Sequence, residues 1–383
     1  MKQDTAYHGF EQGPIRPPSE ARSLLIRVTR NCPWNRCAFC PVYKGSRFSL
    51  RSVEHVIRDI DAVHRYVEKL RREGGNLPMA KARHLAPDPS EAGVDMAAFQ
   101  AAVHWSLGSM DSVFLQDANS LIMPPKDLVR VLEHLKKRFP WVRRITSYAR
   151  SHTVARISDH HLSTMTSAGL NRIHIGLESG SDRVLKKVKK GVDKATQIKA
   201  GQKIKTAGMA LSEYVMPGLG GRSLSEEHAA ETADALNQID PDFIRLRTLA
   251  VPNGSPLAEQ IAAGEFEKMT DVETAAEIRR FIQALEGITS RIVSDHILNL
   301  FEEVEGRLPE DKPRMLDALD RFLTLDAEEQ MLYQVGRRLG LFSRIDELSL
   351  DNRRRRAEQA CRQFGITPSN VDDTIDVLMK QFI

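Results

Sequence analysis

The feature that most constrains the fold of this chain is a repeated alternation of β-rich and helical segments between residues 22 and 257. Six runs with strand character are predicted strands: 23–29, 112–117, 143–149, 171–178, 211–218 and 242–251. Segments with helical periodicity lie between them. Repeated β/α units form a parallel sheet with right-handed crossovers, and a closed barrel needs about eight of them. The sequence therefore predicts an α/β fold, an incomplete (β/α)6 TIM-like barrel.

The rest of the chain divides around this barrel. Residues 1–21 form a predicted N-terminal extension, and residues 22–257 form the partial barrel. The connection between the first two strands is longer than one helix requires, which predicts an insertion at about 76–110. Strand patterns fade after residue 257, so residues 258–383 are a predicted helical C-terminal region.

Composition and the absence of long apolar runs in the sequence predict the cellular compartment of the protein. Hydrophobic residues make up 41% and charged residues 28% of the chain, as is usual for a globular protein. No apolar run approaches the ~20 residues of a membrane span, and the N-terminus lacks the apolar segment of a signal peptide. These features predict a cytoplasmic protein without a membrane partner. A reducing cytosol disfavours structural disulfides and leaves metal binding or catalysis as the use of clustered thiols.

Three of the four cysteines, Cys32, Cys37 and Cys40, are clustered in the segment NCPWNRCAFC (31–40). Closely spaced thiolates on a loop suit a soft metal or an iron–sulfur cluster. A structural zinc site needs a fourth Cys or His, and the nearest histidine in sequence, His8, lies in the N-terminal extension. Three ligands on a four-iron cluster leave one iron open to a substrate or cofactor. The distant Cys361 is interpreted as a buried small side chain.

Three cysteines directly after the first strand of an incomplete barrel, with Phe39 before the last of them, resemble the radical S-adenosylmethionine (SAM) superfamily. The resemblance implies a [4Fe–4S] cluster held by Cys32, Cys37 and Cys40, with SAM on the open iron and Phe39 beside the cofactors. It also implies reductive cleavage of SAM to a radical that takes a hydrogen atom from a substrate. The spacing CxxxxCxxC has one residue more than the family's usual CxxxCxxC, which a loop can accommodate as a bulge.

The resemblance also implies SAM contacts at the ends of the second and third predicted strands. Gln116 and Asp117 occupy the place of the family's Gly-Gly-Glu turn, which holds the SAM amino group, and Asp117 is the better acceptor for an ammonium. The alternative is that Asp117 only caps a turn. Ser147 and Arg150, in TSYARS, are predicted contacts to the SAM carboxylate.

The segment GLNRIHIGLESGS (169–181) resembles the GLESGS segment of one branch of the family. That branch contains oxygen-independent coproporphyrinogen dehydrogenase, the tRNA methylthiotransferases and the elongator catalytic subunit. The resemblance implies that Glu178 binds the ribose or amino end of SAM, with Ser179 nearby. The segment EYVMPGLGG (213–221) resembles the family's fifth-strand turn, in which Gly218 lets the backbone approach adenine.

The cysteine count separates the possible chemistries. Methylthiotransferases carry a second cluster with three further cysteines, and only Cys361 remains here. The sequence therefore predicts a single-cluster radical SAM enzyme that abstracts hydrogen from a small or medium-sized substrate. Its expected partners are that small molecule and an electron donor such as flavodoxin or ferredoxin.

Two other functions stay open. Basic segments at 134–144, 186–191 and 353–356 suit an enzyme that modifies tRNA or another RNA, although nucleic acid is not the favoured partner. The same segments are also typical of solvated helix faces balanced by the 51 acidic residues of the chain. The other function is a non-enzymatic carrier of haem or iron–sulfur clusters, which would keep the three cysteines without cleaving SAM.

Overall fold

The computed structural model describes residues 6–74, 85–90 and 93–380, so the predicted insertion at 76–110 lies partly outside the described residues. Two compact units make up the chain. Unit 1 comprises residues 1–35, 42–175 and 202–211, and unit 2 comprises residues 36–41, 176–201 and 212–383. Cys32 therefore belongs to unit 1, whereas Cys37 and Cys40 belong to unit 2.

The main sheet is eight-stranded and mainly parallel, with the strand order β1-β4-β5-β6-β7-β8-β9-β10. Its strands are β1 (Leu24–Arg27), β4 (Ser112–Gln116), β5 (Arg144–Ala149), β6 (Leu170–Glu178), β7 (Ala210–Val215), β8 (Phe243–Leu246), β9 (Arg291–Val293) and β10 (Gly306–Arg307). A separate antiparallel pair consists of β2 (Thr29–Arg30) and β3 (Ser49–Leu50). The six predicted strands correspond to β1 and β4–β8, so the α/β prediction is confirmed.

The structure corrects the expected number of strands. Strands β9 and β10 follow residue 257, in the region that was predicted to be helical. β9 pairs in parallel with β8, and β10 pairs antiparallel with β9. Strands of three and two residues are too short to show a period-two pattern, which is why the sequence did not reveal them.

In unit 1, β1 pairs with β4, β4 with β5, and β5 with the first part of β6, all in parallel. Because side chains alternate across a strand, Phe114, Tyr148 and His174 share one face of this sheet. Their rings are in contact, with centroids 5.0 Å apart for Phe114 and Tyr148 and 5.8 Å apart for Tyr148 and His174. We call this the aromatic face. The opposite face carries Val113 and Ile145, which are buried.

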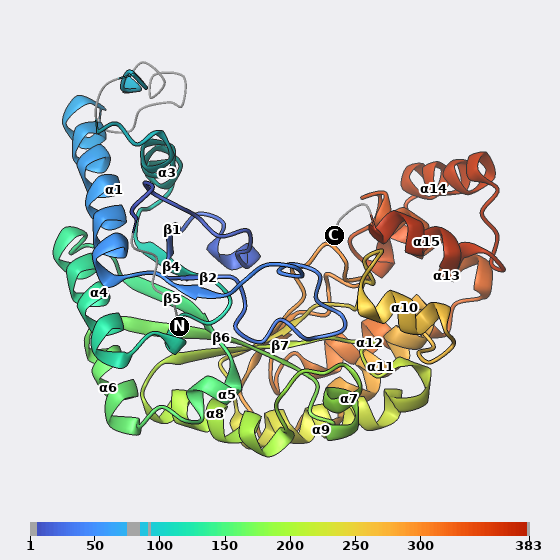
Figure 1. The fold of residues 1–383 in the computed structure, drawn as a ribbon. Coiled ribbons are helices and arrows are strands. Elements are labelled where there is room, and N and C mark those ends of the chain that lie inside the picture. The colour runs from blue at the N-terminus through green and yellow to red at the C-terminus, as the bar shows by residue number, and fades with distance from the viewer. Residues whose placement is uncertain (1–5, 75–84, 91–92, 381–383) are drawn as a thin grey trace. The chain divides into compact units, whose positions relative to one another are not determined.

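The helices of unit 1 pack beside one another along its sheet: α1 with α3 and α4, and α4 with α6 (Figure 1). Their bounds are α1 (Val53–Gly74), α3 (Met96–Ser106), α4 (Pro125–Arg138), α5 (Ser151–Val154) and α6 (Asp159–Ser167), with short 3-10 turns η1 (Pro18–Glu20) and η3 (Ser120–Ile122). Helix α4 illustrates the pattern, because Leu128, Val131, Leu132 and Leu135 recur at helical spacing and are buried.

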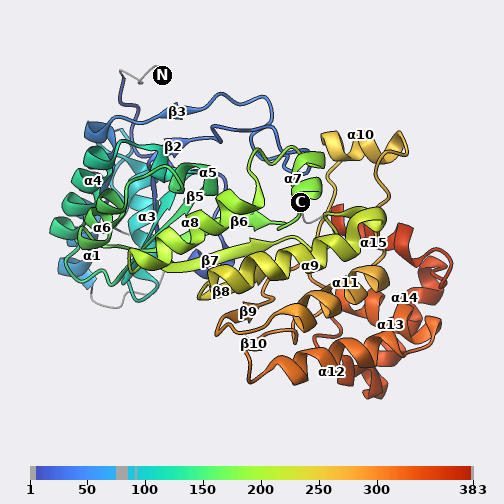
Figure 2. The same ribbon diagram turned by 90° about the horizontal axis from the view of Figure 1, so that it is seen from below.

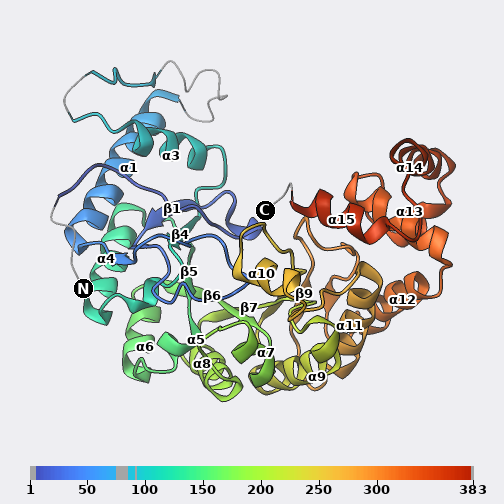
Figure 3. The same cartoon turned by 45° about the vertical axis from the view of Figure 1, so that its right-hand side comes forward.

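In unit 2, α9 packs against α11, and α11 against α12 (Figure 2). Further along the chain, α13 packs against α14 and α15 (Figure 3). The bounds are α7 (Asp182–Lys187), α9 (Gly221–Ile239), α10 (Pro256–Ala262), α11 (Asp271–Ala284), α12 (Lys312–Leu323), α13 (Ala327–Arg338), η4 (Ile345–Ser349), α14 (Asp351–Phe364) and α15 (Val371–Met379), and α8 (Lys194–Thr206) has residues in both units. The helical character of the C-terminal region is confirmed.

None of the helices in the described ranges combines the length and apolar character needed to cross a membrane.

Candidate functional site

The three clustered cysteines lie on the segment between β2 and β3, residues 31–48, which we call the cysteine loop. All three are partly exposed. Asn31 and Asn35 have left-handed backbone, with φ of 65° and 48°, a conformation that asparagine tolerates better than most residues. The Asn35 amide N–H donates to Cys32 Sγ at 3.4 Å. Asn35 therefore turns the chain inside the unusually long interval between Cys32 and Cys37.

Within unit 1, side-chain hydrogen bonds connect the first part of the cysteine loop to its last part. Asn31 Nδ2 donates to the carbonyl of Arg47 at 2.6 Å, and Asn35 Nδ2 donates to the carbonyl of Tyr43. Lys44 Nζ donates to the carbonyl of Asn35 at 3.0 Å. These bonds join residues that precede Cys37 to residues that follow Cys40.

Backbone hydrogen bonds and apolar packing hold the segment that carries Cys37 and Cys40 in unit 2. Ala38 donates its amide N–H to the carbonyl of Val188 at 2.9 Å and accepts from the amide of Leu257 at 3.1 Å. Ala38 and Phe39 belong to a buried apolar cluster against which the two cysteines pack. The residues between the two thiols are thus part of a hydrophobic core.

The donor set of the cysteine loop fits an iron–sulfur cluster, because thiolates are its usual protein ligands. Among the described residues, no group of three or more His, Cys, Asp or Glu side chains is already arranged to hold a metal ion. Cys361 lies in α14 and is buried, which raises the pKa of its thiol. That environment agrees with the interpretation of Cys361 as a packed side chain.

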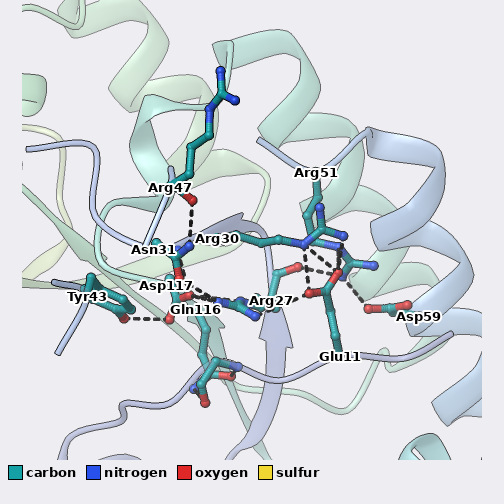
Figure 4. Close-up of polar contacts among 11 residues, drawn as sticks. Glu11, Arg27, Arg30, Asn31, Tyr43, Arg47, Arg51, Asp59, Gln116 and Asp117 are labelled. Carbon is teal, nitrogen blue, oxygen red and sulfur yellow. Dashed lines mark hydrogen bonds and ion pairs between the residues drawn. The ribbon is translucent and has the colours of Figure 1, made fainter. Parts of the chain in front are cut away.

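Asp117, which follows β4, is fully buried within unit 1 (Figure 4). Its Oδ2 accepts from Arg27 Nε at 2.9 Å, from Arg27 Nη2 at 2.6 Å and from the Asn31 amide at 3.1 Å. Its Oδ1 accepts from the Tyr43 hydroxyl at 2.8 Å. Burial, followed by the charge of Asp117, raises the pKa of Tyr43, so that hydroxyl remains a donor at neutral pH.

Gln116, the last residue of β4, is also buried and contacts the N-terminal extension. Its Oε1 accepts from the Gly13 amide at 2.8 Å, and its Nε2 donates to the carbonyl of Ile15 at 2.7 Å. The side chains of Gln116 and Asp117, both predicted to contact the SAM amino group, are thus hydrogen-bonded to other parts of the chain.

Arg27, the ion-pair partner of Asp117, belongs to a network of alternating positive and negative side chains. The Glu11 carboxylate forms ion pairs with Arg27, Arg30 and Arg51, with N–O distances of 3.3, 2.6 and 2.7 Å. Arg51 in turn pairs with the buried Asp59 at 2.5 Å. Burial acts to raise the pKa of Glu11, but Arg30, Arg51 and Arg27 together outweigh it and lower that pKa. Glu11 is therefore ionised at neutral pH.

The two residues predicted from TSYARS lie in different surroundings. Ser147 is fully buried on the sheet face opposite the aromatic face, and its Oγ donates to the carbonyl of Tyr148 at 3.1 Å. Arg150 follows β5, and its guanidinium carbon lies 5.2 Å from the ring centroid of Trp34. Since Trp34 stands between Cys32 and Cys37, the structure places Arg150, and not Ser147, beside the cysteine loop.

In unit 2, Glu178 forms an ion pair with Lys190, with Oε1 and Nζ 3.0 Å apart. A Cβ on Gly176 would lie 2.2 Å from Glu178 Oε1, so this glycine leaves room for the pair. Lys190 Nζ also lies 5.7 Å from the ring centroid of Phe39. Two predicted cofactor residues, Phe39 and Glu178, are therefore linked by a lysine that the sequence indicated only as part of a basic segment.

Glu213 on β7 is buried near this ion pair. Burial raises its pKa well above the usual 4.5, an effect that the charge of Lys190 partly opposes and that of Glu178 increases. The Glu213 carboxyl therefore holds its proton to a higher pH than an exposed glutamate does.

Ser179 and Gly218 belong to turns that meet a buried polar network in unit 2. Ser179 Oγ lies 2.8 Å from Nδ1 of His228, and Gly218 donates its amide N–H to Glu277 Oε1 at 2.7 Å. Gly218 has a φ of 88°, a conformation that favours glycine. The Ser179 side chain thus points to α9, while the Gly218 turn is held by α11.

Comparison with known proteins gives a match to the radical SAM superfamily model over residues 87–233. The tRNA uridine(34) acetyltransferase of Methanocaldococcus infernus is 27% identical over 129 residues. That alignment covers 33% of this chain and 24% of the relative, so this chain spans about a quarter of the length of the acetyltransferase.

The solved structures found in the comparison have low identity to this chain and TM-scores below 0.5. The archaeal Methanocaldococcus infernus Elp3 is 20% identical, with a TM-score of 0.39 over 48% of each chain. The radical SAM methyltransferase TsrM from Kitasatospora setae is 14% identical, with a TM-score of 0.44 over 64% of this chain and 38% of TsrM. The cobalamin-dependent radical SAM enzyme OxsB is 14% identical, with a TM-score of 0.46 over 95% of this chain and 54% of OxsB.

The matched segment begins after the cysteine loop and carries the strands from β4 to β7, including Gln116, Asp117 and Glu178. The loop with its three thiols lies earlier in the chain, between β2 and β3, and outside the matched segment. The similarity to the radical SAM superfamily thus covers the part of the chain that carries most of the predicted SAM residues.

Proposed function

We propose that Cys32, Cys37 and Cys40 hold the [4Fe–4S] cluster of a radical SAM enzyme that abstracts hydrogen from a small or medium-sized substrate. The observation that carries the proposal is the cysteine loop itself, whose three partly exposed thiols follow β1 of the main sheet and the short β2. When bound, the cluster supplies the electron for reductive cleavage of SAM, which starts the hydrogen abstraction. An electron donor such as flavodoxin or ferredoxin would reduce the cluster, and the cytoplasm would keep the thiols reduced.

Charge and position support roles for three of the predicted SAM residues. Arg150, next to Trp34 of the cysteine loop, would bind the SAM carboxylate. Glu178, which already pairs with one ammonium group, would bind the amino or ribose end. Gly218, held with positive φ, would let the backbone approach adenine. Contacts of SAM with Gln116, Ser147 and Ser179 stay predictions, because in this structure their side chains are bonded to protein groups.

The test is anaerobic reconstitution with iron and sulfide, followed by dithionite and SAM and measurement of 5′-deoxyadenosine. About four irons per chain and production of the nucleoside are expected. The Cys37→Ala variant should lose both, and Cys361→Ala is the matched control that should keep both. Iron without nucleoside would favour the carrier of haem or iron–sulfur clusters, and zinc in place of iron would overturn the proposal.

Modification of RNA is the second candidate function, and the similarity to a tRNA uridine(34) acetyltransferase over 129 residues favours it. The measurement is binding of total tRNA as a function of salt concentration. Binding to several phosphates makes the affinity fall steeply with salt, by roughly three orders of magnitude between 50 and 200 mM for about six contacts. If the chain does not bind tRNA even in low salt, a small-molecule substrate remains.

A further inference from the structure

We propose that Asp117 is a positioning residue that holds the two flanks of the cysteine loop together before the cluster binds. This inference rests on the proposed function, because it concerns the loop that would carry the iron ligands. It assigns the carboxylate after β4 to the protein's own loop and not to the SAM amino group.

The contacts of Asp117 reach both sides of the three thiols (Figure 4). One carboxylate oxygen accepts from the amide of Asn31, which directly precedes Cys32, at 3.1 Å. The other accepts from the hydroxyl of Tyr43, three residues after Cys40, at 2.8 Å. Asn31 and Tyr43 are twelve positions apart in the chain, yet they share one buried side chain. A single carboxylate therefore fixes the distance between Asn31 and Tyr43, on the two sides of the three thiols.

The chemistry of the carboxylate is needed for this arrangement. Both oxygens of an ionised aspartate accept hydrogen bonds, whereas an asparagine of the same size has one acceptor and one NH2 donor. With Asn at position 117, either Tyr43 or the pair of Arg27 and Asn31 would face a donor. Since the Asp117 and Tyr43 side chains are buried, a bond lost between them could not be replaced by one to water.

The ion pair with Arg27, which is itself paired with Glu11, stabilises the buried Asp117 carboxylate and holds it in place. Arg27 donates twice to Asp117 Oδ2, and the other side of its guanidinium faces Glu11. Glu11 is itself shared with Arg30 and Arg51. A buried charge is stable when it is paired and its hydrogen bonds are satisfied. The N-terminal extension thus contributes, through Glu11, to the position of Asp117.

The backbone of the extension also closes over the carboxylate. A Cβ on Gly13 would lie 2.2 Å from Asp117 Oδ1, so any larger residue there would force the carboxylate or the extension to move. Gly13 is bonded to Gln116 through both its amide and its carbonyl, at 2.8 and 3.2 Å. With protein groups on each side, Asp117 is built as a fixed support for the loop and not as an open ligand site.

The experiment compares Asp117→Asn and Tyr43→Phe with Glu20→Gln. Glu20 is the matched control, because it is another fully buried carboxylate of unit 1 and its described partners Ser23, Arg144 and His174 lie outside the cysteine loop. Two readouts are taken: amide hydrogen exchange of the cysteine loop in the apo protein, and the rate at which a chelator removes iron after reconstitution. Circular dichroism verifies that each variant is folded.

Asp117→Asn should speed loop exchange and iron release by about tenfold or more, as expected when hydrogen bonds to a charged acceptor are lost. Tyr43→Phe, which leaves the ion pairs intact, should give a smaller change in the same direction, and Glu20→Gln should match the wild type. Wild-type exchange and iron retention in Asp117→Asn, with weaker SAM binding, would overturn the inference and favour the SAM amino group as its ligand.

The two proposals fail in different ways. A wild-type protein that binds no iron would contradict the proposed function, while exchange in the apo protein would still test the role of Asp117. If Asp117→Asn does not fold, Tyr43→Phe alone decides, and unchanged loop exchange in that variant contradicts the inference.

Discussion

The side chain of Ser179 is turned toward His228, with Oγ 2.8 Å from Nδ1 of the imidazole. The other ring nitrogen, Nε2, lies 3.1 Å from the carbonyl of Met216. A carbonyl only accepts, so Nε2 carries a proton and donates it to this bond. His228 on α9 therefore joins the turn after β6 to the turn after β7, and both belong to unit 2.

This geometry predicts that His228→Leu destabilises unit 2. The change removes the imidazole bonds to the Met216 carbonyl and the Ser179 hydroxyl, at about 0.5–1.5 kcal/mol for each lost bond, because the two groups keep their bonds to the Leu219 and Ser181 amides. Urea unfolding gives the free energy, and His160→Leu, at an exposed position, is the control. If the two turns contact SAM as proposed, SAM affinity should fall in His228→Leu while its iron content stays at the wild-type level. Equal stabilities of the two variants would contradict the role of His228.

A methyl group at position 13 is expected to detach the N-terminal extension. The added carbon would stand 2.2 Å from Asp117 Oδ1, and overpacking of this kind costs about 1–3 kcal/mol. Gly108→Ala is the matched control, because its Cβ would meet its nearest neighbour at an ordinary 3.6 Å. Limited proteolysis should cut the Gly13→Ala extension much faster than that of the wild type or of Gly108→Ala. An equally resistant extension would show that Gly13 does not need to be a glycine.

The raised pKa of Glu213 predicts how stability depends on pH. The folded chain holds a proton on Glu213 that the unfolded chain releases above its usual pKa of 4.5. Stability is therefore lost as the pH rises from that value through the higher folded pKa. Glu213→Gln should be more stable than the wild type at pH 8, and the difference should shrink toward pH 4.5.

Urea unfolding at several pH values measures this difference. Glu226→Gln, at an exposed position on the neighbouring α9, should show no such trend. A constant difference between Glu213→Gln and the wild type across the pH range would mean that Glu213 is ionised in the folded protein.

Cys361 should be the least reactive of the four thiols. It is buried in α14, and burial raises its pKa, whereas the thiolate is the form that reacts. Iodoacetamide at neutral pH should modify Cys32, Cys37 and Cys40 of the apo protein first, as followed by mass spectrometry of the peptides. Cys361 should react at a comparable rate only in urea. Rapid labelling of Cys361 in the native protein would show that α14 does not protect it.

The strands β1 and β4–β8 could be predicted because each is long enough to show its own local pattern. Strands β9 and β10 could not, because so few residues carry no periodicity of their own and depend on β8 as a template. The cysteines were evident from their spacing. Which residue of a turn faces a site was less evident: Ser147 and Arg150 are close in sequence, but only Arg150 stands beside the cysteine loop.

What the sequence by itself determined is local: the order of β/α units, the three-thiol loop and the glycine-containing turns. The partners of buried charges were decided only by the tertiary structure. Asp117 bonds to Asn31, Tyr43 and Arg27, which are 86, 74 and 90 positions away. Among 55 basic and 51 acidic residues, ionic attraction depends on the distance between charges in space, and the sequence does not contain that distance. Folding brings β1, β4 and the N-terminal extension together. Only then can the Asp117 carboxylate, which follows β4, bind both sides of the cysteine loop.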